Sequence, residues 1–71
     1  MNNEIAKQRG ARLKQAREKT GLTQVQVASK IGVSKSYYVH LEQGFNDLGK
    51  VRGSIKILLE KVLHIDVASL L

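Results

Sequence analysis

Three glycines divide much of the chain into short segments with helical apolar spacing, and this pattern constrains the fold more than any other feature. Gly21, Gly32 and Gly44 each follow a stretch in which apolar residues recur every three or four positions. Glycine readily takes the left-handed position that ends many helices. Strict apolar–polar alternation, which marks a half-buried strand, never persists, and aromatic residues make up only 4%. We therefore expect an all-α fold, a compact bundle of about five short helices.

The first helix is predicted from about residue 4 to residue 19. Its inward residues are expected to be Ile5, Ala6, Leu13 and Ala16. Gly10 interrupts this pattern, and a glycine inside a helix costs up to about 1 kcal/mol relative to alanine. We therefore expect the helix proper to begin near Gly10 and to end at Thr20-Gly21.

The next two helices have clear start signals. Thr23 and Gln26 have the spacing of a capping box, in which each side chain bonds a free backbone N–H of the other. Ser34 is the expected N-cap of a third helix that runs to about Gln43. Ala28 is small where the two helices approach each other, and Gly32 can take the positive φ of the turn between them. The segment 23–44 therefore predicts a helix-turn-helix.

The remainder predicts a loop and two more helices. Residues 45–53 read as a loop that contains Gly49 and Gly53, and a helix then starts between positions 48 and 54. The inward residues of this fourth helix are expected to be Ile55, Leu58, Leu59, Val62 and Leu63. Asp66 can cap a last short helix that ends at Leu71.

Composition limits the classes of function. The 71 residues predict one domain, 1–71, which is too small for a deep catalytic cleft with a separate substrate lobe. Without cysteine, and with His40 and His64 far apart, we expect no metal site, no catalytic residues, no cofactor and no small-molecule ligand. Twelve Lys and Arg against six Asp and Glu leave a net charge of +6, which favours an anionic partner, nucleic acid first. No apolar run reaches the length of a membrane span, so we expect no membrane association and a cytoplasmic, nucleoid-associated protein.

The segment TQVQVASKIGVSKSYYVHLEQG, residues 23–44, resembles the helix-turn-helix of the lambda-repressor-like family, also called the Xre or Cro/C1 type. The preceding ARLKQAREKTGLTQ resembles the first helix of that family, and the closing IDVASLL resembles its fifth. Two features depart from the family pattern. Tyr38 stands where the family usually has Ile or Val, and the loop 45–53 is longer and lacks the common proline.

The resemblance implies a sequence-specific regulator that binds double-stranded DNA with its third helix in the major groove. The positions that would read bases are Lys35, Ser36, Tyr37 and His40. The positions that would contact phosphate are Gln24, Thr23, Ser34, Gln43, Asn46, Lys50 and Arg52. Arg17 and Glu42 match a pair that the family joins by a structural salt bridge.

The resemblance also implies a homodimer on a pseudo-palindromic operator, as in a repressor of phage or mobile-element type. Val67, Leu70 and Leu71 are the candidate dimer interface, since they are apolar and close the sequence. The alternative is an antitoxin or antirepressor that binds a protein, or a restriction-modification controller. These classes share one fold, so fold alone does not separate them.

Overall fold

The computed structural model describes residues 4–71, and within that range it contains no strand. Its α-helices are α1 (Glu4–Thr20), α2 (Gln24–Ile31), α3 (Lys35–Gln43) and α4 (Gly53–Leu63). Two 3-10 helices, η1 (Leu48–Lys50) and η2 (Val67–Leu70), complete it. The predicted all-α class is confirmed, but the expected fifth α-helix is a short 3-10 segment. Residues 1–3 of the expected domain lie outside the described residues.

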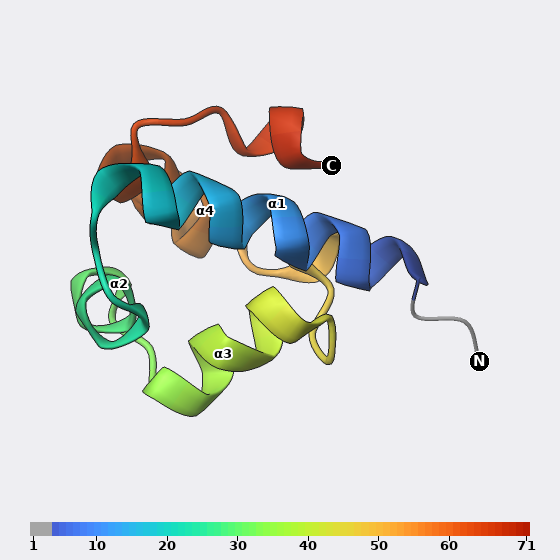
Figure 1. Ribbon diagram of the computed structural model, residues 1–71, viewed down its shortest axis with the longest axis horizontal. Coiled ribbons are helices and arrows are strands. Elements are labelled where there is room, and N and C mark those ends of the chain that lie inside the picture. The colour runs from blue at the N-terminus through green and yellow to red at the C-terminus, as the bar shows by residue number, and fades with distance from the viewer. Residues whose placement is uncertain (1–3) are drawn as a thin grey trace.

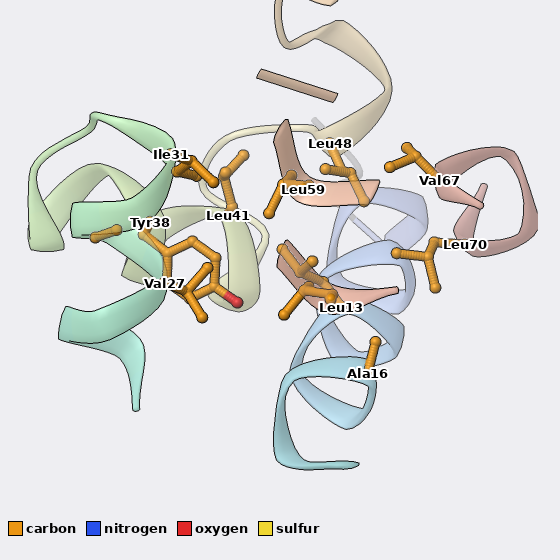
Figure 2. Close-up of a cluster of buried hydrophobic side chains, with 12 residues drawn as sticks. Leu13, Ala16, Val27, Ile31, Tyr38, Leu41, Leu48, Leu59, Val67 and Leu70 are labelled. Atoms are coloured by element: carbon orange, nitrogen blue, oxygen red, sulfur yellow. The ribbon is translucent and has the colours of Figure 1, made fainter. Parts of the chain in front are cut away.

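Helix α1 runs along the length of the molecule, with α3 on one side of it and η2 on the other (Figure 1). One hydrophobic cluster receives side chains from all six helical elements (Figure 2). Its largest fully buried members are Tyr38, Leu13, Ile31, Leu41, Leu48, Leu59 and Val27. Helices of eight to eleven residues, such as α2, α3 and α4, are marginal in isolation, so this shared core holds them in place. In the described part of the chain, no helix is both long and apolar enough to cross a membrane.

Helix α1 differs from the prediction at its N-terminal half. It runs without a break through Gly10, so the expectation that the helix begins near Gly10 is wrong. A Cβ at Gly10 would overlap the backbone carbonyls of Leu41 and Glu42, which shows that α3 packs directly on this position. Ala6 is buried as expected, but Ile5 is 62% exposed and does not face the core.

The caps around the helix-turn-helix are those that the sequence predicts. The Thr23 hydroxyl oxygen accepts a hydrogen bond from the backbone N–H of Gln26, and the Gln26 side-chain oxygen accepts one from the backbone N–H of Thr23. Ser34 caps α3 by accepting from the Tyr37 amide. Gly32 has a φ of 76°, a conformation that costs most other residues free energy, and this turn directs α3 away from α2.

The segment 45–53 is more ordered than the expected loop. It contains η1, whose Leu48 is fully buried in the core, and Gly53 already belongs to α4. Asp47 caps η1 by accepting from the Gly49 amide, and it also forms an ion pair with Arg9 of α1 at 2.9 Å. Within α4, Leu59 and Leu63 are buried, but Leu58 is 36% exposed and was wrongly expected to face inward.

The C-terminal residues close the core of the same chain. Val67 and Leu70, two of the expected interface residues, are 3% and 8% exposed and pack in the core of their own chain. Leu71 is 42% exposed. The Val67 amide donates to Glu60 of α4, and the Arg12 side chain of α1 donates to the Leu70 carbonyl at 3.2 Å. These bonds fix η2 against α1 and α4.

Candidate nucleic-acid interface

One face of α3 is exposed along its whole length. It carries Lys35, Ser36, His40 and Gln43, which are exposed, and Val39, which is half-buried. These positions fall on a single side of a helix with 3.6 residues per turn. Figure 1 shows α3 at the edge of the molecule, away from η2. The face therefore presents hydrogen-bond donors, acceptors and one cation on a projecting helix.

The opposite face of α3 is anchored in the protein. Tyr38 and Leu41 are fully buried (Figure 2), and Glu42 is 8% exposed. The last turn of α3 rests on Gly10 of α1, where only a hydrogen atom fits beside the α3 carbonyls. Because the backbones of the two helices are in contact here, the distance between α3 and α1 is fixed.

A buried ion pair joins α3 to α1. Arg17 Nε donates to Glu42 Oε2 at 2.7 Å, and Arg17 Nη1 donates to the Leu22 carbonyl at 2.8 Å. Gln24 Nε2 donates to the other Glu42 oxygen, Oε1, at 3.0 Å. The Glu42 carboxylate therefore connects α1, α2 and α3. Gln24, an expected phosphate contact, is half-buried and uses its amide N–H in this network.

The charges of this network are mutually stabilised. Burial by itself raises the pKa of Glu42, but hydrogen bonds from Arg17 and Gln24 outweigh it, so the pKa is lowered overall. The hydrogen bond with Glu42 raises the pKa of Arg17. Burial raises the pKa of Tyr38 far above its usual range, and its hydroxyl lacks a direct hydrogen-bond partner among the described residues. Tyr38 therefore stays neutral beside an ionised pair.

Tyr37 lies apart from the exposed face of α3. It is half-buried and packs against the core. It lines a hollow that also includes Ile5, Phe45 and Val51. Its position between α1 and the segment after α3 separates it from Lys35 and Ser36, with which the sequence grouped it.

The expected phosphate contacts fall into two groups. Thr23 and Ser34 use their side-chain oxygens as helix caps, with hydrogen bonds of 3.1 Å each. Gln43, Lys50 and Arg52 are exposed. Asn46 is half-buried, and its backbone N–H donates to the His40 carbonyl at 3.2 Å.

Three side chains near α3 were missed by sequence reasoning. Val39 shares the exposed face, and its position four residues after Lys35 could have revealed it. Phe45 is 70% exposed, and its ring packs edge-to-face against the His40 ring, with the two ring centroids 5.4 Å apart. Arg9 binds Asp47 across 38 positions of sequence, and no local pattern signals such a pair. The Gly49 amide and then Arg9 lower the pKa of Asp47.

The comparisons with known proteins agree with this geometry. A family model described as a helix-turn-helix domain matches residues 8–52, which is more than half of the chain. No curated protein and no solved structure matches the chain. The matched range includes most of α1 and all of α2, α3 and η1.

Proposed function

The chain belongs to the helix-turn-helix domain family, and from this premise we propose that it is a sequence-specific regulator that binds double-stranded DNA through α3. The exposed polar face of an anchored α3 carries the proposal. A helix fits the major groove of B-form DNA, where base edges present distinct donors and acceptors. Residues 1–71 would then form one DNA-binding domain.

Within this proposal, base reading falls to the first turns of α3. Lys35 can donate to guanine O6 or N7, and Ser36 can donate or accept. His40 lies one turn further along and is held by Phe45. Val39 offers methyl groups to a thymine methyl. Tyr37 is half-buried, so we assign it a supporting position beside the DNA rather than a base contact.

Phosphate contacts would position the helix on the duplex without reading sequence. We assign them to Gln43, the last residue of α3, and to Asn46, Lys50 and Arg52 in the segment that follows it. Thr23, Ser34 and Gln24 contribute through the N-termini of α2 and α3, whose free N–H groups favour phosphate. Arg17 and Glu42 hold the helices in register.

Two copies would be needed to read a site of useful length, so we propose a homodimeric repressor, of phage or mobile-element type, on a pseudo-palindromic operator. Ile57 and Leu58 on α4 are 53% and 36% exposed, and with Leu71 they supply apolar surface outside the core. Sedimentation equilibrium tests this: Ile57→Asp should shift the dimer to monomer, whereas Val25→Asp, at the 55% exposed Val25 of α2, should not. Equal behaviour of both variants would count against the α4 interface.

Selection of bound sites from random duplex DNA tests the function itself. We expect one enriched, roughly two-fold symmetric sequence. On that sequence, Lys35→Ala should weaken binding by about 5- to 100-fold and relax the preference at one base pair in each half-site. The matched control is Lys14→Ala, which removes an exposed cation from α1. Failure to enrich any sequence would refute sequence-specific binding.

A further inference from the structure

A second surface of the molecule is a groove beside the C-terminal half of α1. Its walls are the C-terminal half of α1, the ends of α2 and α4, and η2. No residue of α3 lines it. Figure 1 shows α3 and η2, which lines part of the groove, on opposite sides of α1.

The rim of the groove is cationic. Its basic side chains are Arg12, Lys19, Lys30, Lys61 and His64, and no carboxylate lines it. Lys19, Lys30 and Lys61 are exposed, and among residues 4–71 none of the three forms an ion pair. Three elements that are distant in the sequence therefore bring unneutralised positive charge to one place.

The floor of the groove is apolar. Leu22, Val62 and Ile65 are half-buried and pack against the core, which leaves part of each side chain facing the groove. The groove therefore combines an apolar strip with a positive border. Such a surface matches a ligand that carries carboxylates and apolar side chains together.

We propose that this groove binds an acidic amphipathic segment of another protein. A second copy of this chain is a poor occupant of the groove, because it has only six Asp and Glu, and two of them, Glu42 and Asp47, are already in ion pairs with its own arginines. A DNA duplex presents phosphates and sugars on its outer surface and would leave the apolar floor uncovered. An acidic peptide with apolar side chains on one face could pair its carboxylates with the basic border and cover the apolar floor with its apolar side chains.

The position of the groove gives the proposal a regulatory meaning. Because no residue of α3 lines the groove, one molecule could hold DNA on α3 and the peptide in the groove at the same time. The groove would recruit a protein to the DNA site that α3 selects. This inference does not depend on the proposed base contacts, since peptide binding is measured without DNA.

The test uses a fluorescein-labelled peptide of twelve residues, built from Glu and Leu at helical spacing, and measures its anisotropy with the full chain. Lys61→Glu should weaken binding at least fivefold. Lys14→Glu, the same charge change on the face of α1 outside the groove, should change it less than twofold. Circular dichroism checks that both exposed variants are folded.

Two further measurements separate the groove from simple charge attraction. A peptide with every Leu replaced by Ser keeps its charge and should bind at least tenfold more weakly, because it cannot cover the floor. The amide resonances of Leu22, Val62 and Ile65 should shift with the Leu peptide, while those of residues 35–43 should not. No binding, equal loss in both variants, retained binding of the Ser peptide, or displacement of the peptide by a duplex would each overturn the proposal.

Discussion

At the scale of single residues, Gly10 is where sequence pattern and structure disagree most. By helix propensity alone, Gly10→Ala should stabilise α1 by up to about 1 kcal/mol. In the folded chain, however, the added Cβ would overlap the carbonyls of Leu41 and Glu42, which are backbone atoms of α3 and cannot rotate away. We expect Gly10→Ala to lower the free energy of unfolding by about 2 kcal/mol, measured by urea denaturation.

Gly53 provides the matched control for this prediction. It is the first residue of α4, its φ is not positive, and a Cβ there would meet no heavy atom within 4 Å. Gly53→Ala should therefore be neutral or stabilise the protein by up to about 1 kcal/mol. If both alanine variants were equally stable, the close approach of α1 and α3 would not be a constraint.

The Glu42 carboxylate makes stability depend on pH. Its pKa is lower in the folded chain than the value of about 4.3 that an unfolded glutamate has. The folded state therefore binds fewer protons, and the resulting stability is fully present above the unfolded pKa. It is lost as pH falls from about 4.3 through the folded pKa. Urea midpoints measured from pH 7 to pH 3 should fall accordingly.

Glu42→Gln isolates this contribution from that of Asp47, whose pKa is also lowered. The variant leaves Arg17 without a counter-charge and should be about 3 kcal/mol less stable than the parent chain at neutral pH. The stability difference between the two proteins should shrink as the parent's Glu42 becomes protonated. A difference that stays constant from pH 7 to pH 3 would show that the ion pair contributes nothing through its charge.

At the scale of elements, the sequence predicted those features that depend on neighbouring residues. Thr23 and Gln26 lie three positions apart and cap each other, so their bond could be predicted without knowing the fold. The position of Ser34 likewise marks the start of α3. The exposed face of α3 follows from helical period in the same way, which is why Lys35, Ser36 and His40 share it.

Apart from the Arg17–Glu42 ion pair, which the family resemblance implied, features that depend on distant residues were not predicted. Leu48 lies between polar and glycine neighbours, and only the folded chain places it in the core. The side chain that holds its segment is Arg9, 38 positions before Asp47. Tyr37 is on the same helix as Lys35, but its side chain lines the hollow that Ile5 and Phe45 also line, and so it lies off the exposed face. Long-range packing, which periodicity does not encode, decided these outcomes.

Leu48 tests whether η1 is part of the core. Leu48→Ala removes a fully buried side chain and should lower the free energy of unfolding by about 2–5 kcal/mol. Phe45→Ala, three residues earlier, removes a side chain that is 70% exposed and should change it by less than about 0.5 kcal/mol. Thermal unfolding of the two variants checks the contrast, and similar melting temperatures would show that the segment is only a loop.

At the scale of the whole molecule, the net charge of +6 is not all available to DNA on α3. Six of the twelve cations lie in residues 1–19, but several of them are in ion pairs or in the lining of the groove. Arg9 and Arg17 are in ion pairs with Asp47 and Glu42. Arg12 and Lys19 line the groove that η2 borders. The cations that α3 can bring to a duplex are therefore far fewer than composition suggests.

The salt dependence of DNA binding measures how many cations take part. Each phosphate contact contributes about −0.9 to the slope of log affinity against log salt concentration. Lys50→Gln and Arg52→Gln should each make the slope shallower by about 0.9, because both are exposed and are the cations assigned to phosphate contacts. Lys19→Gln and Lys61→Gln remove equal charge from the groove and should leave the slope unchanged. Equal effects from all four variants would mean that DNA responds to the charge of the whole molecule, and that α3 does not determine which side faces the duplex.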